Sequence, residues 1–148
     1  MKPKRKQLPH EIPSCVPDGS RYFITVNCRQ RDRDWLCQSG FAPQLLASVP
    51  VYEDMNKWFV HAMVVMPDHI HWIAVFGGTF GVRPVMSSWK GYFAKELGID
   101  WQYNFFEHRL RNEAEFTEKM QYVLMNPVRK KLVTKWRDWP YTFARGMW

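Results

Sequence analysis

The hydrophobic residues of this chain follow two different periods, and the change of period predicts alternating strands and helices. Short runs rich in β-branched and aromatic residues are typical of buried strands. These strand segments are residues 21–28, 58–66, 69–76 and 101–108. Apolar residues that recur every three or four positions are typical of helices. These helical segments are residues 43–56, 84–97 and 112–126.

A turn signal divides the longest apolar stretch of the chain. Residues 58–78 are long enough to cross a bilayer, but they contain three histidines and an aspartate. Pro67-Asp68 in the middle is typical of a turn between two strands. We therefore expect two buried strands paired as a hairpin, and no membrane segment.

The order of these elements predicts the fold class. A central hairpin, with helices between the other strands, favours an α+β fold in which helices pack on one face of an antiparallel sheet. With 46% hydrophobic residues in 148, the chain can bury a core without disulfides. We expect a single domain over residues 20–148. Residues 1–19, with four prolines and four basic side chains, predict a mobile basic arm that lies along a phosphate backbone, or a solvated tail.

The charge balance indicates a polyanionic partner. Lys and Arg number 21 against 14 Asp and Glu, a net charge of +7, which favours nucleic acid over a membrane. The basic residues 1–7 are not followed by an apolar stretch, so no signal peptide is expected. Three cysteines without C-x-x-C spacing favour reduced thiols in a cytoplasmic, nucleoid-associated protein. Zinc binding by Cys28 and Cys37 with histidines is the alternative. No feature indicates an obligatory protein partner.

Two histidines open the segment 69–76. Side chains alternate along a strand, so His69 and His71 point to one face and Ile70 to the other. Two imidazoles placed in this way can hold one divalent ion. A His-x-His motif is common by chance, and hydrogen-bonded structural histidines are the alternative. The apolar surroundings favour the metal site, because an uncompensated polar pair would be costly there.

The last helical segment carries a tyrosine away from its apolar stripe. Asn112, followed by Glu115, predicts a capped start, and Pro127 predicts an end at Asn126. The apolar stripe consists of Phe116, Met120, Val123 and Leu124. At about 100° per residue, Tyr122 and Asn126 share a side off this stripe. A tyrosine that flanks a core with its hydroxyl in water gives the same pattern, and with six tyrosines spacing alone does not identify a nucleophile.

Two motifs together resemble the REP-associated tyrosine transposases, which belong to the single-tyrosine HUH transposases. The first is Met-Pro-Asp-His-Ile-His-Trp at residues 66–72, and the second is Tyr-Val-Leu-Met-Asn-Pro-Val-Arg at residues 122–129. The similarity extends from about residue 22 to residue 143. The combination is far more specific than either motif alone. It implies a nuclease core of the ferredoxin- or RRM-like kind.

The resemblance also implies roles for individual residues. It implies that His69, His71 and Asn126 hold Mg²⁺ or Mn²⁺, and we expect Mn²⁺ to bind more tightly because imidazole suits it better. It implies that Tyr122 attacks a phosphate of single-stranded or hairpin DNA and forms a 5′-phosphotyrosine intermediate. Such an intermediate allows strand transfer without ATP. Lys119, one helical turn before Tyr122, is a candidate for the base only by proximity.

Basic residues flank the expected catalytic helix, and we expect them to contact DNA phosphates. They are Arg109 and Arg111 before the helix, and Arg129, Lys130 and Lys131 after it. Ordinary solvated charge is the alternative. The sequence thus predicts a metal-dependent single-strand DNA endonuclease and strand transferase that acts at hairpin-forming repeats. The rival functions are a relaxase or replication-initiator nuclease and a non-catalytic binder of hairpin nucleic acid.

Overall fold

Strands and helices alternate along the chain, as the hydrophobic pattern predicts. The computed structural model describes residues 19–77 and 80–148, so the predicted basic arm lies outside the described residues except for Gly19. The strands are β1 (Arg21–Asn27), β2 (Trp58–Val65), β3 (His69–Phe76), β4 (Phe106–Leu110) and β5 (Thr142–Ala144). The helices are α1 (Phe41–Asp54), α2 (Val82–Leu97), α3 (Glu113–Leu124) and α4 (Asn126–Arg129), followed by a 3₁₀ turn at Trp136–Asp138.

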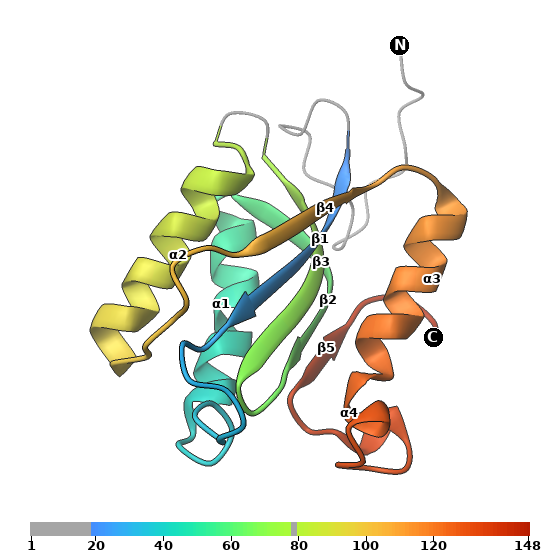
Figure 1. Cartoon of the computed structure of the whole chain (residues 1–148). Helices are drawn as coiled ribbons and strands as arrows, with labels where there is room; N and C mark the ends of the chain where they lie inside the picture. Colours follow the sequence, from blue (N-terminus) through green and yellow to red (C-terminus); the bar gives the residue numbers. More distant parts are fainter. Residues whose placement is uncertain (1–18, 78–79) are drawn as a thin grey trace.

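The five strands form one antiparallel sheet in the order β4-β1-β3-β2-β5 (Figure 1). β3 occupies the centre, between β1 and β2. The turn at Pro67-Asp68 joins β2 to β3, which confirms the predicted hairpin. Among the described helices, none combines the length and the apolar character that crossing a bilayer requires.

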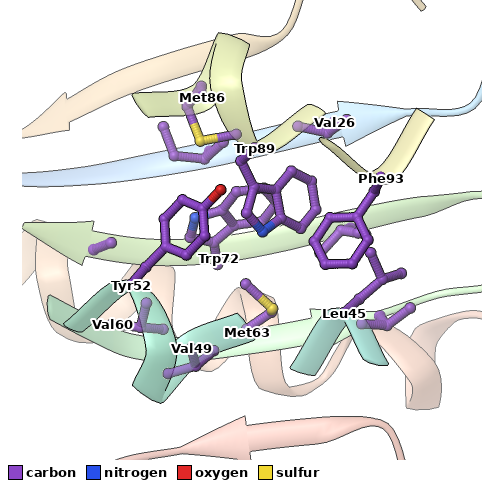
Figure 2. Close-up of a cluster of buried hydrophobic side chains, with 14 of the residues drawn as sticks. Val26, Leu45, Val49, Tyr52, Val60, Met63, Trp72, Met86, Trp89 and Phe93 are labelled. Atoms are coloured by element: carbon purple, nitrogen blue, oxygen red, sulfur yellow. The ribbon is translucent and has the colours of Figure 1, made fainter. Parts of the chain in front are cut away.

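α1 and α2 cover one face of the sheet with an aromatic core (Figure 1). Trp58, Trp72 and Trp89 are fully buried there. The ring centroids of Trp72 on β3 and Trp89 on α2 are 5.1 Å apart (Figure 2). The indole N–H groups of Trp58 and Trp89 donate to the Val49 carbonyl and the Ser48 hydroxyl, so neither is left unpaired in the core.

α3 covers the opposite face of the sheet, so the prediction that the helices pack on one face was wrong (Figure 1). The residues of its predicted apolar stripe are all buried, namely Phe116, Met120, Val123 and Leu124. They pack against side chains of the sheet, among them Phe23 of β1, Ala62 of β2 and Ile73 of β3. Every residue of β3 is buried, which is typical of a strand covered on both faces.

The start of α3 is capped as predicted. Asn112 Oδ1 accepts a hydrogen bond from the Glu115 backbone N–H at 2.9 Å. The Glu115 carboxylate in turn accepts from the Arg111 N–H at 2.7 Å, one residue before the cap. α3 ends at Leu124, two residues before its predicted end, and α4 begins after this break with Pro127 in its first turn.

Two strands differ from the prediction. Of the predicted strand 101–108, Trp101 makes only an isolated bridge to the residue after β1, and the paired strand β4 begins at Phe106. The backbone carbonyls of residues 102 and 103 instead accept hydrogen bonds from Lys90 Nζ, at 2.7 and 2.8 Å. β5 was not predicted, because a strand of three residues is too short to show a period.

A β-bulge at His61 changes which face of the sheet each following side chain of β2 points to. The register with β3 shifts between Val60 and Ala62. Val60 therefore packs on the side of α1 and α2, whereas Ala62 packs on the side of α3. The imidazole of His61 lies 5.0 Å from the Phe116 ring, centroid to centroid. Its Nε2 is buried and finds no hydrogen-bond partner in the part of the chain that the structure describes.

We expect His61 to make the fold sensitive to acid. Burial, followed by the charges of Arg21 and Arg145, lowers the pKa of His61 from 6.5 to about 3. The unfolded chain takes up this proton near pH 6.5 and the folded chain only near pH 3, so stability falls as the pH drops through this window. Between pH 7 and pH 5 the free energy of unfolding of the wild-type protein should fall. In urea denaturation, this fall should be smaller in His61→Leu by about 1–2 kcal/mol. An unchanged pH dependence would contradict this expectation.

Candidate active site

The two histidines begin β3 on the face that α3 covers. His69 and His71 are 5% and 8% exposed, and their ring centroids are 4.7 Å apart. Ile70, between them, packs into the core beneath α1 and α2. The Phe23 ring of β1 stacks on His71 at 5.4 Å. The prediction that both imidazoles share one face is confirmed.

Each imidazole is held through its Nδ1 atom. His69 Nδ1 lies 2.7 Å from Asp68 Oδ1, and His71 Nδ1 lies 2.8 Å from Thr25 Oγ1. An ionised carboxylate can only accept, so His69 donates its Nδ1 proton and keeps a lone pair on Nε2. The Thr25 hydroxyl can accept in the same way, which leaves Nε2 of His71 for a ligand. Histidines that bind metals are commonly oriented by such hydrogen bonds.

Asp68 is held as an anion behind His69. Its second carboxylate oxygen accepts hydrogen bonds from Arg31 Nε at 3.0 Å and from the backbone N–H of Asp32 at 2.8 Å. Burial alone raises the pKa of Asp68, but the hydrogen bonds from Arg31, His69 and Asp32 outweigh it and lower the pKa to about 2. A carboxylate in this position makes the imidazole of His69 a more basic ligand.

Both histidines are neutral at physiological pH. Burial, followed by neighbouring groups that include Arg129 and Arg31, lowers the pKa of His71 to about 3. Burial also lowers the pKa of His69, against the opposing effect of Asp68. The neutral imidazole is the form that binds a metal ion, so neither residue must lose a proton to do so.

Asn126 brings a third ligand group to the histidines. It is the first residue of α4, it is 2% exposed, and its amide nitrogen lies 3.1 Å from His69 Nε2. The amide oxygen lies 3.3 Å from the Arg129 guanidinium. Within the described residues no three His, Cys, Asp or Glu side chains are grouped for a metal, so a third donor would have to be the oxygen of this amide, turned from Arg129 towards the histidines. Two imidazoles and an amide fit Mn²⁺ or Mg²⁺, and His69, His71 and Asn126 could hold such an ion.

The alternative zinc site does not form from the cysteines. Cys28 and Cys37 are free thiols in the core beneath α1 and α2, whereas His69 and His71 face α3. Burial raises the pKa of each thiol to about 12. Zinc binds the thiolate form, so these two cysteines contribute to the packing of the core and do not form the zinc site.

Tyr122 lies beside the histidines near the end of α3. Its ring centroid is 5.8 Å from that of His71 and 6.0 Å from that of Phe23. The residue is 43% exposed, in contrast to the buried apolar stripe of the same helix. The off-stripe position predicted from the helical period is confirmed. Tyr122 is therefore close to the candidate ligand group, which consists of His69, His71 and Asn126. It is still accessible to a macromolecular substrate.

Two cations flank the Tyr122 ring. The Arg129 guanidinium carbon lies 3.9 Å from the ring centroid, and Lys119 Nζ lies 5.0 Å from it. Arg129 is fixed in place by a hydrogen bond of 2.8 Å to the Tyr122 carbonyl. Positive charge around an accessible side chain attracts a phosphate.

The five basic residues predicted to contact DNA do not all gather at this site. Arg129 is part of it, and Lys130 and Lys131 are exposed directly after α4. Arg109 points to the opposite face of the sheet, because the next residue of β4 packs against α3. Arg111 is exposed beyond the end of β4.

Three residues that hold the site together were not recognised in the sequence, namely Thr25, Arg31 and Asp68. Thr25 is 46 positions from His71, and Arg31 is 37 positions from Asp68, so only the fold brings these pairs together. Asp68 was interpreted as a turn residue alone. Its position next to a candidate histidine ligand was the available signal, because carboxylates often support such ligands.

Comparison with known proteins identifies relatives over most of the chain, although no family model matches it. The REP-associated tyrosine transposase of Escherichia coli K12 is 32% identical over an alignment of 135 residues that covers 87% of this chain and 79% of that protein. A Haemophilus influenzae protein assigned by name to the same transposases is 23% identical over an alignment of 144 residues. The alignment covers 84% of this chain and 79% of that protein.

A solved structure has the same fold. It is a REP-associated tyrosine transposase bound to a REP hairpin. Its sequence is 26% identical, the TM-score is 0.73, and the superposition covers 96% of this chain and 82% of that chain. Together with the identity to the Escherichia coli protein, it shows that the chain belongs to the REP-associated tyrosine transposases.

Proposed function

We propose that this transposase is a metal-dependent single-strand DNA endonuclease and strand transferase that acts at hairpin-forming repeats through a 5′-phosphotyrosine intermediate. The observation that carries the proposal is the position of Tyr122, 5.8 Å from the ring of His71 and on the same side of the sheet as the three ligand groups. Phosphate attack by a side-chain hydroxyl requires a hydroxyl that the substrate can reach and a group beside it that activates it, and a metal ion held by the imidazoles would be such a group.

The side chains around Tyr122 would bind and orient the scissile phosphate. Arg129 and Lys119 lie on the Tyr122 ring and offer positive charge, and Lys130 continues this charge onto the surface. Asp68 and Thr25 hold the two imidazoles in fixed orientations, so the ligand group does not need to reorganise when DNA arrives. Mg²⁺ or Mn²⁺, when bound, would neutralise phosphate charge.

Tyr122 would then exchange one ester bond for another. Its Oη forms a bond to phosphorus while the bond from phosphorus to the 3′-oxygen breaks, which leaves a free 3′-hydroxyl and a 5′-phosphotyrosine. Because the new ester keeps the bond energy of the old one, a second 3′-hydroxyl can reverse the step on another strand without ATP. The Tyr122 proton must pass to a base. Lys119 is a candidate only by proximity, and it would have to be neutral to accept the proton, because a charged ammonium binds phosphate but has no lone pair.

Hairpin DNA is the substrate that the relatives favour. The solved transposase of the same fold is bound to a REP hairpin, and the net charge of +7 here suits a polyanion. A relaxase or replication initiator would share the histidines and the tyrosine, but the identity to transposases over 87% of the chain favours a transposase. A non-catalytic hairpin binder would not need Tyr122.

The first test is covalent trapping of DNA. Wild-type protein is incubated with Mn²⁺ and labelled single-stranded hairpins from the DNA that flanks its gene. It should give a protein–DNA adduct that survives denaturation. Tyr122→Phe should bind the hairpin equally well and form no adduct, because only the attacking hydroxyl is removed. Tyr92→Phe is the matched control, since Tyr92 is 55% exposed on α2, which covers the opposite face of the sheet. Adducts from Tyr122→Phe would place the nucleophile elsewhere.

Removal of a histidine tests the metal. His71→Ala should lower Mn²⁺ affinity by more than about 100-fold, because even the groups that support a ligand contribute 10- to 100-fold. Hairpin affinity should change little, since phosphate contacts spread over the basic surface provide most of it. Calorimetric titration of Mn²⁺ and a gel-shift assay measure the two effects. Unchanged Mn²⁺ affinity would rule out His71 as a ligand.

Asn126 can be tested as a ligand or as a helix-turn residue. If Asn126 is a ligand, Asn126→Asp should keep or strengthen Mn²⁺ binding, because it retains an oxygen and adds charge. Asn126→Leu should weaken it. If the residue only shapes the start of α4, both variants should change thermal stability and leave Mn²⁺ affinity as it was. Melting curves with and without Mn²⁺ separate the two roles.

A further inference from the structure

The side-chain amide of Asn126 lies between two partners of opposite hydrogen-bonding character. Its nitrogen lies 3.1 Å from His69 Nε2, and its oxygen lies 3.3 Å from Nη2 of Arg129. His69 donates its Nδ1 proton to Asp68, so its Nε2 can only accept, whereas a guanidinium can only donate. Both partners therefore select the same orientation of the amide, with the nitrogen towards His69 and the oxygen towards Arg129.

This orientation is the reverse of the one that a metal ligand needs. An amide binds a divalent cation through its oxygen, but the nitrogen of Asn126 faces His69 and engages the lone pair of Nε2. Asn126 is 2% exposed, so its side chain is enclosed and cannot exchange a lost partner for bulk water. A half-turn of the amide about its last torsion, which has a roughly two-fold preference, brings the oxygen to the histidines.

The same half-turn removes a partner from Arg129. It places the amide nitrogen against Nη2, where two donors face each other without an acceptor. The hydrogen bond from Arg129 to the Tyr122 carbonyl, at 2.8 Å, does not involve the amide and can persist. The guanidinium then stays beside the Tyr122 ring, with Cζ 3.9 Å from the ring centroid, and has N–H donors for a phosphate.

We propose that the Asn126 amide is a two-position switch that couples metal binding to phosphate binding. In one position its oxygen is held by Arg129, and in the other the oxygen faces the two histidines. The second position frees the Arg129 guanidinium for the phosphate that Tyr122 attacks. The proposal rests on the proposed function, because it takes Asn126 as a metal ligand. Since coupling is reciprocal, a metal ion and a phosphate each strengthen the binding of the other.

The first measurement is the Mn²⁺ affinity of the protein without DNA, by calorimetric titration. Arg129→Met keeps an aliphatic stem beside Tyr122 and removes the guanidinium, so the amide can turn without losing a hydrogen bond to it. Mn²⁺ affinity should rise by about three- to tenfold, the range of one ordinary hydrogen bond. Arg129 is exposed, so the variant should fold, and a melting curve checks this.

Lys130→Met is the matched control for charge. Lys130 is the next residue and is also exposed. Burial, followed by the charges of Arg31 and Lys130, lowers the pKa of His69, so the Lys130 ammonium acts on the same site. Lys130→Met removes one positive charge and leaves the hydrogen bond between Arg129 and Asn126 in place. It should raise Mn²⁺ affinity by less than Arg129→Met does.

Asn126→Asp separates the switch from charge repulsion. A carboxylate has two oxygens, so one can accept from Arg129 while the other faces the histidines, and no half-turn is needed. In the Asn126→Asp background, Arg129→Met should therefore raise Mn²⁺ affinity by a smaller factor than in the protein with Asn126. Repulsion between the guanidinium and the ion would act in both backgrounds alike.

Hairpin binding gives a second readout of opposite sign. It is measured in the Tyr122→Phe background, which retains the ring and does not cut, by fluorescence anisotropy with labelled hairpins from the DNA that flanks the gene. With Mn²⁺, Arg129→Met should lower hairpin affinity by about tenfold, as for one lost hydrogen bond between charged groups. Without Mn²⁺ it should change little, because Asn126 holds the guanidinium. Lys130→Met should have the same effect with and without Mn²⁺.

Three results would overturn the switch. They are a rise in Mn²⁺ affinity in Arg129→Met no larger than in Lys130→Met, an equal rise in the Asn126→Asp background, and a loss of hairpin affinity in Arg129→Met that does not depend on Mn²⁺. Adduct formation by the protein with Tyr122 reports separately on the proposed function. Adducts together with any of the three results refute the switch alone, whereas absence of both adducts and Mn²⁺ binding refutes the proposed function and the switch with it.

Discussion

The burial of β3 on both faces is the constraint on which the other features of this structure depend. All eight residues of the strand are buried, so each face must be covered by helices. α1 and α2 cover one face with tryptophans, and α3 covers the other. Because the histidines lie on the face of α3, the helix that completes the core also carries Tyr122 to them. Folding and assembly of the candidate site are thus one event.

Burial also decides the charge state of the ligand group. An imidazole at the end of a buried strand loses solvation, which favours its neutral form. The lost contacts with water are replaced by Asp68 and Thr25, which fix the orientation of each ring. The neighbouring Arg31 and Arg129 favour the neutral imidazole further, and they leave positive potential for a phosphate. The same surroundings therefore suit both of the proposed roles of the site, the binding of a metal ion and of a DNA phosphate.

The sequence predicted the parts of the fold that depend on local patterns. The hairpin, the cap at Asn112 and the apolar stripe of α3 follow from periods and turn residues, and the structure has all of them. The second covered face was missed, although the unbroken apolar run of β3 indicated it. β5 and the late start of β4 depend on pairing partners far along the chain, and a pattern of a few residues does not contain that information.

The break between α3 and α4 separates Tyr122 from Asn126. In one continuous helix, Tyr122 and Asn126 would share a side and have similar exposure. Met125, between the two helices, has φ −84° and ψ −1°, so its ψ departs from the regular helical value. Asn126 can then turn into the interior, where it is 2% exposed, while Tyr122 stays 43% exposed. Pro127, which would be costly inside one continuous helix, is placed in the first turn of α4, and the break puts a buried amide beside an accessible hydroxyl.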